Sequence, residues 1–364
     1  MARPTILILT THTGGGHLNL ARSLRDMLEP DYDVVIANPQ PGIFGPAYTA
    51  QSRHAPKLIE LQHTLTDSAR AAFLYHRLLA LFSSGHILAL LERYRPHLVI
   101  TTHALLSYAT ARVIERSRRH TLLVFQLTDL ERLHMTWFTE KQADAYFAPT
   151  KEIFVQAQQE GIDEDRLHLT GRPVRRQFGE VSPEQTQQIR TGLGFDATTF
   201  TIFLQGGATG SSGIDGLING LLSINMPVQV ILAAGNNASM ASRYAGIEQV
   251  RSLPFTERLA PYMAIADMIA GKAGASFISE AFMLEKPFLA TTFISGQETP
   301  NLHFIEQHNL GWVCLKTQNQ LELLSSLARH PEMLAAKLPS IRDYKAWNSE
   351  ANRRFRPVID RLLS

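Results

Sequence analysis

The fold of this chain is decided by the stretch TILILTTHTGGGHLNLARSL, residues 5–24. An apolar run at residues 6–9 has the length of a buried strand, and three glycines and a histidine follow it. A helical pattern then begins at residue 18. Turns between a strand and a helix often bind phosphate, because backbone N–H groups at the helix N-terminus attract anions. The stretch therefore predicts an α/β unit and raises the question of whether a nucleotide binds in its turn.

The rest of the chain continues this alternation of short β-rich runs with longer helical patterns. In the first half, strands are predicted at residues 5–9, 33–38, 98–102, 121–127, 145–148 and 166–169. In the second half, they are predicted at residues 200–205, 228–233, 250–253, 268–271, 287–291 and 311–314. Helices are predicted between them, at residues 18–28, 74–94, 105–118, 152–160, 214–222, 257–265, 277–284 and 301–307. Such alternation is typical of doubly wound parallel sheets.

A polar segment at residues 179–199 separates the two alternations. We therefore expect a Rossmann-like domain over residues 1–180, a linker over 181–198 and a second Rossmann-like domain over 199–345. Residues 346–364 are expected to form an amphipathic terminal helix. Two facing domains of this class bind ligands at the carboxyl ends of their strands, in the cleft between the domains.

The composition is that of a globular protein. Of 364 residues, 45% are hydrophobic and 19% charged, and the net charge of +2 gives no argument for nucleic acid. The single cysteine, Cys314, excludes an intramolecular disulfide and fits a reducing cytoplasm. No run approaches the ~18–20 apolar residues of a membrane span. The apolar run near the N-terminus is expected to be the first strand, not a signal peptide.

The opening turn does not match the dinucleotide-binding fingerprint. Its glycines Gly14, Gly15 and Gly16 are followed by His17, and the third glycine of the fingerprint is missing. The next predicted strand ends at Asn38, where an acidic residue would be needed to bind a ribose. We therefore expect the nucleotide to bind elsewhere.

Two later turns suit a nucleotide diphosphate better. The stretch LQGGATGSSG, residues 204–213, places Gly206, Gly207, Thr209 and Gly210 between a strand and a helix, where backbone N–H and hydroxyl groups can bind phosphate. A flexible turn is the alternative.

The second is IAGKAGASFISEAFMLEKP, residues 269–287, which has Lys272, Gly274 and Ser276 before a helix. Glu280, one turn inside that helix, could accept hydrogen bonds from two ribose hydroxyls. A lysine and a glutamate that simply face water are the alternative.

Two further loops carry polar or ionisable groups after a strand. FISGQETPN, residues 293–301, offers the amide of Gln297 and the carboxylate of Glu298, which suit sugar hydroxyls. LTDLERLHMTWF, residues 127–138, contains Asp129, His134 and Trp137. An ordinary polar loop and a buried core segment, respectively, are the alternatives.

Two Asp-x-Asp sequences, at residues 31–33 and 163–165, do not predict a metal site. Both lie in polar loops before predicted strands, not at the carboxyl ends where substrates bind. We expect neither a bound metal nor a cofactor.

These stretches occur together in a known family. TGGGH at residues 13–17, the segment 128–152 and the segment 161–178 resemble the monogalactosyldiacylglycerol synthases and related processive diacylglycerol glucosyltransferases. KAGASFISEAFMLEKPFL and GQETPNLHFI, within residues 272–305, continue the resemblance, which extends from residue 5 to about residue 313. More distantly, the chain is similar to the N-acetylglucosaminyl transferase that makes the peptidoglycan lipid intermediate.

The resemblance implies a GT-B fold and transfer of a hexosyl group from a UDP-sugar, without metal and usually with inversion, to a membrane lipid such as diacylglycerol. It implies that the second domain binds the donor and the first the acceptor. The implied donor residues are Gly206, Gly207, Thr209, Gly210, Lys272, Gly274 and Ser276 for the diphosphate, Phe255 for the base, Glu280 for the ribose, and Gln297 and Glu298 for the sugar. The expected acceptor residues are Gly14, Gly15, Gly16, His134 and Trp137.

His17 and Asp129 are the candidates for the catalytic base. His17 has an unperturbed pKa of ~6.5, which suits proton removal from an acceptor hydroxyl. Asp129 could orient His17 or act as the base itself. Two other functions stay open: a nucleotide-sugar 2-epimerase, and a nucleotide-sugar-binding protein without activity, because Ala208 and Phe277 depart from the pattern of the family.

The segment between residues 42 and 95 mixes apolar and aromatic residues with arginines and a lysine. Such a segment could lie on an anionic bilayer. An ordinary packed helix pair is the alternative. We expect a cytoplasmic protein, possibly peripheral on the inner face of the cell membrane, with no nucleic-acid partner.

Overall fold

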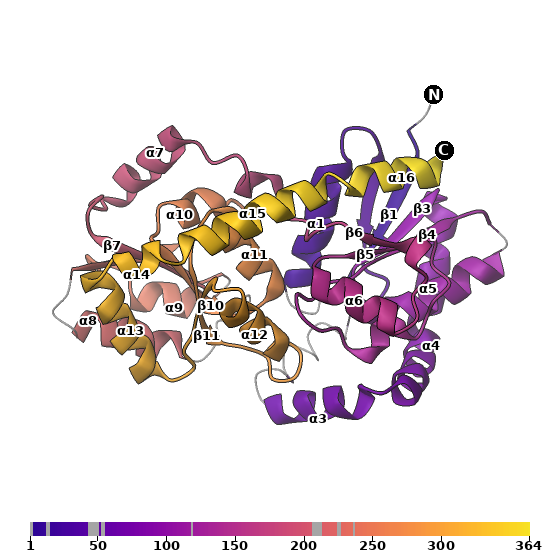
Figure 1. The fold of residues 1–364 in the computed structure, drawn as a ribbon, viewed down its shortest axis with the longest axis horizontal. Helices are drawn as coiled ribbons and strands as arrows, with labels where there is room; N and C mark the ends of the chain where they lie inside the picture. Colours follow the sequence, from indigo (N-terminus) through magenta and orange to yellow (C-terminus); the bar gives the residue numbers. More distant parts are fainter. Residues whose placement is uncertain are drawn as a thin grey trace. The chain divides into compact units, whose positions relative to one another are not determined.

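The computed structural model describes all residues except 1–2, 12–14, 43–50, 52–54, 118, 206–212, 224–226 and 236. The chain divides into two compact units. Unit 1 comprises residues 1–175, 294–300 and 347–364, and unit 2 comprises residues 176–293 and 301–346. Figure 1 shows both units with their elements labelled.

Unit 1 contains a parallel six-stranded sheet in the order β2-β1-β3-β4-β5-β6. Its strands are β1 (Thr5–Leu9), β2 (Asp33–Ala37), β3 (Leu98–Thr101), β4 (Leu122–Gln126), β5 (Ala145–Ala148) and β6 (Leu167–Leu169). The register pairs Leu7 with Val35 on one side and with Val99 on the other. Every residue of β3 and β5 is buried, because helices cover both faces of the sheet.

The helices of unit 1 pack in two layers. α1 (Gly16–Leu28) and α16 (Phe355–Leu363) contribute to one core, where Phe355 lies 4.8 Å from the ring of Phe147. α4 (Ala69–Tyr94), α5 (Ala104–Ser117) and α6 (Lys151–Gln159) contribute to the other core. α3 (Pro56–Thr66) precedes α4, and the short 3-10 helices η1 (Met135–Phe138) and η2 (Glu164–Arg166) lie in loops.

Unit 2 contains a second parallel six-stranded sheet, in the order β12-β11-β10-β7-β8-β9. Its strands are β7 (Phe200–Gln205), β8 (Val228–Ala233), β9 (Val250–Leu253), β10 (Met268–Lys272), β11 (Phe288–Thr292) and β12 (Gly311–Val313). Its helical elements are η3 (Arg176–Phe178), α7 (Pro183–Leu193), α8 (Ile214–Ser223), α9 (Ala238–Arg243), α10 (Ala260–Ala264), α11 (Ala275–Met283), α12 (Thr299–Gln307), α13 (Thr317–Arg329), α14 (Glu332–Ala335) and most of α15 (Leu338–Asn352).

All twelve predicted strands are present, and their ends differ from the predicted ones by at most one residue. The helices agree less well. α7 lies in the segment that was expected to be a polar linker. Ser182 begins it with a capping box, in which the Ser182 side chain accepts from Gln185 N–H and the Gln185 side chain accepts from Ser182 N–H. α3, α9, α13 and α14 were also not predicted.

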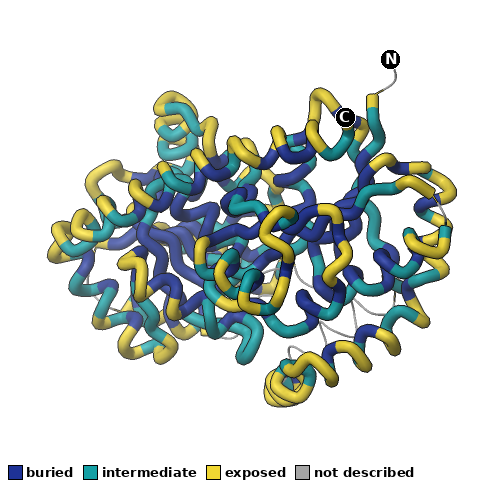
Figure 2. The backbone as a smooth tube through the Cα atoms, turned by 45° about the vertical axis from the view of Figure 1, so that its right-hand side comes forward, coloured by how far each residue is buried: buried dark blue, intermediate teal, exposed yellow. Residues whose placement is uncertain are grey.

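The sequence has no uninterrupted apolar run of the length of a membrane span, but α4 as a whole is a candidate for such a span. This helix is long and apolar enough to cross a membrane by length and composition, with a mean hydropathy of 1.3 over an 18-residue window. Serine, glycine and histidine interrupt its apolar residues, so that no long uninterrupted run is visible in the sequence. Only 22% of that window is buried inside the protein. Exposed residues recur along the helices at the lower edge of Figure 2.

Candidate active site

His17 lies in the first turn of α1, next to the carboxyl end of β3. Its Nδ1 is 2.7 Å from the carbonyl oxygen of Thr102. A carbonyl oxygen only accepts, so Nδ1 carries the proton, and Nε2 is the unprotonated nitrogen of the neutral ring. The geometry therefore fixes the tautomer that a general base with Nε2 as its acceptor atom requires.

His103, which the sequence analysis did not single out, packs against His17. The two ring centroids are 4.2 Å apart. His103 Nδ1 accepts from the N–H of Leu105, 3.2 Å away, at the start of α5. Burial and the neighbouring His17 and His76 lower the pKa of His103 well below its ordinary value. At neutral pH, His103 is therefore a neutral neighbour that adds no positive charge beside His17.

Asp129 follows β4 at the same edge of the sheet as His17. Burial is the largest cause that raises its pKa, to about 7. The negative charge of Glu298 raises the pKa further, whereas Arg172 and a hydrogen bond with Thr128 lower it. Because a general acid or base works best with a pKa near the operating pH, this carboxyl is suited to proton transfer at neutral pH.

His134 and Trp137 both have structural contacts in unit 1. His134 Nδ1 accepts from Thr136 N–H at 3.2 Å, and Nε2–H donates to the carbonyl oxygen of His63 at 2.9 Å. Trp137 is 3% exposed and belongs to the hydrophobic core. These contacts connect the loop after β4 to α3, and a direct contact of either residue with an acceptor stays a prediction.

Several predicted glycines and one threonine cannot be placed. Gly14, Gly206, Gly207, Thr209 and Gly210 lie outside the described residues. Gly15 is the N-cap of α1 and Gly16 its first residue. A Cβ at Gly15 would meet no atom within 4 Å. Folding therefore does not require a glycine at position 15, and its role in admitting an acceptor stays a prediction.

In unit 2, the turn between β10 and α11 contains the predicted anion-binding residues. Lys272 ends β10, Gly274 is the N-cap of α11, and Ser276 lies in its first turn. A Cβ at Gly271 would lie 2.3 Å from the carbonyl oxygen of Gln205, so only glycine permits this approach of β10 to the end of β7. The end of β10 is thereby held close to Gln205, the last residue of β7.

Two other predicted donor residues differ in exposure. Glu280 is 4% exposed on α11, in unit 2. Phe255 follows β9 and is 65% exposed, which leaves its ring accessible for stacking on a base. Neither residue has a ligand contact in this structure, so their roles stay predictions.

The loop at residues 294–300 groups with unit 1, although the strand before it belongs to unit 2. Glu298 is 6% exposed, and its Oε2 accepts from Ile294 N–H at 2.7 Å. Gly296 N–H donates to Thr299 Oγ1 at 3.2 Å, and its Cα packs against the His63 side chain of α3. Gln297 is half-buried in this loop. Internal hydrogen bonds therefore hold the loop that presents Gln297 and Glu298.

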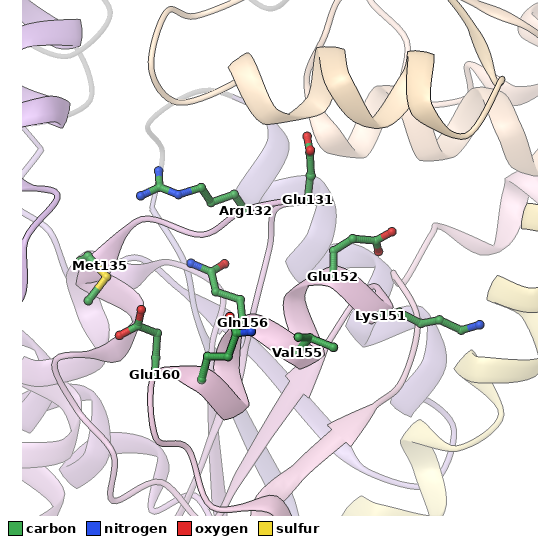
Figure 3. Close-up of a pocket in the computed structure, with 9 residues that line it drawn as sticks. Glu131, Arg132, Met135, Lys151, Glu152, Val155, Gln156 and Glu160 are labelled. Atoms are coloured by element: carbon green, nitrogen blue, oxygen red, sulfur yellow. The ribbon is translucent and has the colours of Figure 1, made fainter.

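A surface groove of about 700 Å³ lies in unit 1, between α6 and the segment after β4. Figure 3 shows its lining, in which Glu131, Glu152 and Glu160 alternate with Arg132 and Lys151. Arg132 forms an ion pair with Asp67 at 2.7 Å. The predicted site residues are not part of the lining, so the groove gives no separate support to the predicted site.

A metal site is not indicated by the described part of the chain, in which no group of three or more histidine, cysteine, aspartate or glutamate side chains is arranged to hold an ion.

Two family models match the chain, one in each half. Residues 35–174 match monogalactosyldiacylglycerol (MGDG) synthase, and residues 201–341 match the glycosyltransferase family 28 C-terminal domain. The chain is 27% identical over 330 residues to monogalactosyldiacylglycerol synthase 3, chloroplastic, of Arabidopsis thaliana, covering 84% of this chain and 70% of that protein. It is 26% identical over 334 residues to the probable MGDG synthase of Glycine max, covering 84% of this chain and 62% of that protein.

Solved structures of similar fold cover almost the whole chain. Anabaena Alr3699/HepE in complex with UDP-glucose has a TM-score of 0.58 at 16% identity, covering 98% of this chain and 99% of that one. The calicheamicin glycosyltransferase CalG4 has a TM-score of 0.66 at 12% identity, covering 100% and 99%. A UDP-N-acetylglucosamine 2-epimerase has a TM-score of 0.57 at 14% identity, covering 97% and 94%. At these identities, the likeness establishes the fold alone.

Both expectations, the GT-B fold and the family resemblance, are confirmed by these matches and by the two parallel doubly wound sheets. The chain is a glycosyltransferase of the MGDG synthase and glycosyltransferase family 28 type.

Proposed function

We propose that this chain transfers a hexosyl group from a UDP-sugar to the hydroxyl of a membrane lipid such as diacylglycerol, with inversion and without a bound metal. The observation that carries the proposal is the tautomer of His17, in which the Thr102 carbonyl holds the proton on Nδ1. The Arabidopsis relative is named for galactolipid synthesis, and Alr3699/HepE binds UDP-glucose, which supports both substrate classes.

On the acceptor side, His17 Nε2 takes the proton of the attacking hydroxyl. The hydroxyl oxygen forms a bond to the anomeric carbon of the sugar, and the bond from that carbon to the β-phosphate oxygen breaks. Asp129, with its pKa near neutrality, either stabilises the imidazolium of His17 or accepts the proton itself.

On the donor side, unit 2 supplies the groups that stabilise the departing UDP. The N-terminus of α11 and the ammonium of Lys272 favour the negative charge that develops on the diphosphate. Glu280 would accept from the ribose hydroxyls, and Phe255 would stack on the base. Gln297 and Glu298 would bind the sugar. Gly206, Gly207, Thr209 and Gly210 complete the proposed phosphate site.

For the lipid, we propose docking of the protein on the inner face of the cell membrane through α3 and α4. Leu58, Leu61 and Leu65 on α3 are 52%, 53% and 65% exposed, at the three- to four-residue spacing of one helix face. On α4, Leu74, Leu78 and Leu81 are 65%, 56% and 77% exposed.

Basic side chains accompany this apolar surface. Lys57, Arg70 and Arg77 are exposed on the same two helices. Each basic residue near an anionic surface contributes ~1 kcal/mol of attraction. Apolar insertion and charge therefore both favour an anionic bilayer.

A product assay tests the proposal. The full chain is incubated with UDP-galactose, UDP-glucose or UDP-N-acetylglucosamine, with and without vesicles that contain diacylglycerol, and the lipids are analysed by mass spectrometry. We expect a hexosyl lipid only when the vesicles are present. We expect none from His17→Ala. Lipid-independent conversion of the sugar nucleotide would instead establish an epimerase. Nucleotide binding with no product from any donor would establish a binding protein.

A further inference from the structure

A buried arginine that the proposed reaction does not yet use lies beside Asp129. Arg172 is 3% exposed and stands in the turn after β6, between Gly171 and Pro173. Its Nη1 donates to the carbonyl oxygen of Thr128, the residue before Asp129. The guanidinium therefore fixes the chain directly at the start of the Asp129 loop.

The backbone of Arg172 is held as firmly as its side chain. Its N–H donates to Oδ1 of Asn348 at 2.7 Å, and its carbonyl accepts from Nδ2 of Asn348 at 3.1 Å and of Asn352 at 3.2 Å. Gly171 has a φ of +71°, and a Cβ there would lie 2.8 Å from Asn348 Oδ1. Two asparagines of α15 thus fix the position from which the Arg172 side chain extends.

A buried guanidinium needs a compensating negative charge, because its desolvation is otherwise costly. Asp129 is one such charge, because Arg172 lowers its pKa. The charged groups that act on Asp129 are Arg172, from the turn after β6, and Glu298, from the loop 294–300. Glu298 and burial oppose ionisation of Asp129, whereas Arg172 favours it.

We propose that Arg172 is a positioning residue that holds the Asp129 loop through Thr128 and favours the ionised form of Asp129 beside Glu298. This role rests on the proposed function, in which Asp129 acts on the acceptor side. Without the guanidinium, burial and the carboxylate of Glu298 act on Asp129 unopposed, so Asp129 takes up a proton at a higher pH.

The test compares Arg172→Met, which keeps most of the side-chain length and removes the charge, with Arg172→Lys, which keeps the charge. Arg166→Met is the matched control, because Arg166 is a half-buried arginine at the opposite end of β6. The dependence of kcat/KM on pH is measured for each full-length variant. Thermal melting reports folding.

For Arg172→Met, the acid limb of the profile is expected to move about one to three pH units upward, the range by which an adjacent arginine shifts an aspartate. From a pKa of about 7, a shift of one unit lowers the activity at pH 6.5 about eightfold and a larger shift lowers it more, and the loss shrinks as the pH rises. Arg172→Lys should keep the limb near its wild-type position even if Arg172→Met folds poorly. Guanidinium ion at millimolar concentration should partly restore Arg172→Ala.

If Arg172→Met loses the same fraction of kcat/KM at every pH and its acid limb does not move, Arg172 only supports the fold. If Arg172→Met has the activity of the wild type, Arg172 has no role in the site. Carbon-13 NMR of the Asp129 carboxyl, assigned with Asp129→Asn, gives a readout that does not require turnover. If the wild type transfers no sugar but the Asp129 titration still moves in Arg172→Met, the proposed function fails and the role of Arg172 stands. An unmoved titration overturns the role itself.

Discussion

The two strand–turn–helix units that begin at β1 and at β10 share the order of their elements, but they differ in their side chains and in the backbone of the helix N-cap, which is helical at Gly15 and extended at Gly274. In unit 1, the turn before α1 leads to His17, whose proton is held by a carbonyl. In unit 2, the turn before α11 contains Lys272 and the N-cap Gly274. A helix N-terminus attracts negative charge in both, but a neutral imidazole suits proton transfer and an ammonium suits a diphosphate. Under the proposed function, the side chain beside the helix N-terminus is therefore what suits each unit to its substrate.

His17→Ala is the strongest test of this comparison. General base catalysis contributes ~100- to 10,000-fold, so we expect transfer to fall by that factor. Binding of UDP, measured by calorimetry, should not change, because the residues proposed to bind its diphosphate, ribose and base lie in unit 2. His86→Gln, which alters an exposed histidine of α4, is the control. Normal turnover by His17→Ala would exclude the residue from the mechanism.

Lys272→Met should weaken the binding of UDP, which His17→Ala should leave unchanged. A hydrogen bond to a charged group contributes about 1.5–3 kcal/mol, so the dissociation constant of UDP should rise by about 10- to 150-fold. Lys316→Met, an exposed lysine before α13, is the matched control. If UDP binds to Lys272→Met as it does to the wild type, the diphosphate is bound elsewhere.

A smaller effect is expected from the exposed face of α3 and α4. Leu61→Glu combined with Leu78→Glu should reduce flotation with anionic vesicles several-fold, because two apolar side chains become charged beside an anionic surface. Both leucines are more than half exposed, so the melting temperature should stay the same. Leu315→Glu, at an exposed leucine in unit 2, is the control. Equal flotation of all variants would argue against docking through these helices.

The smallest effect concerns stability and Asp129. Its pKa is raised from the ordinary value to about 7, so the folded protein binds this proton more tightly than the unfolded chain does. This carboxyl therefore contributes stability at low pH that is lost as the pH rises from about 4 through about 7. Asp129→Asn should melt a few degrees higher than the wild type at pH 8, and the difference should shrink toward pH 4. A difference that does not depend on pH would contradict the raised pKa.

The sequence predicted the strands well because most are short apolar runs, and β3, β5 and β8 are buried throughout. It predicted helices less well where the segment is polar and lacks an apolar helical pattern. α7 is an example, because its capping box at Ser182 and Gln185 lies within a polar segment. Asp129 and Lys272 could be chosen because residues at the carboxyl ends of parallel strands gather at one edge. His103 had the same signal, because it follows β3, and could have been found.

Other features depend on tertiary contacts that sequence spacing does not reveal. An arginine between a glycine and a proline is usually exposed, and only the asparagines of α15 and the Thr128 carbonyl make Arg172 a buried residue. Trp137, expected to contact the acceptor, is buried in the core by the 3-10 turn that His134 caps. A single sequence does not show which aromatic residue of such a loop packs inward.

The contribution of α16 to unit 1 has a consequence for the order of folding during synthesis. Phe355 and Ile359 are fully buried in the core that also contains Ile6 and Ile8 of β1. The ribosome makes one half of this core before unit 2 and the other half after it. All residues of unit 2 have been made by residue 346, whereas unit 1 lacks part of its core until α16 emerges. Although its synthesis begins before that of unit 2, unit 1 therefore has all of its core residues only after unit 2 has been made.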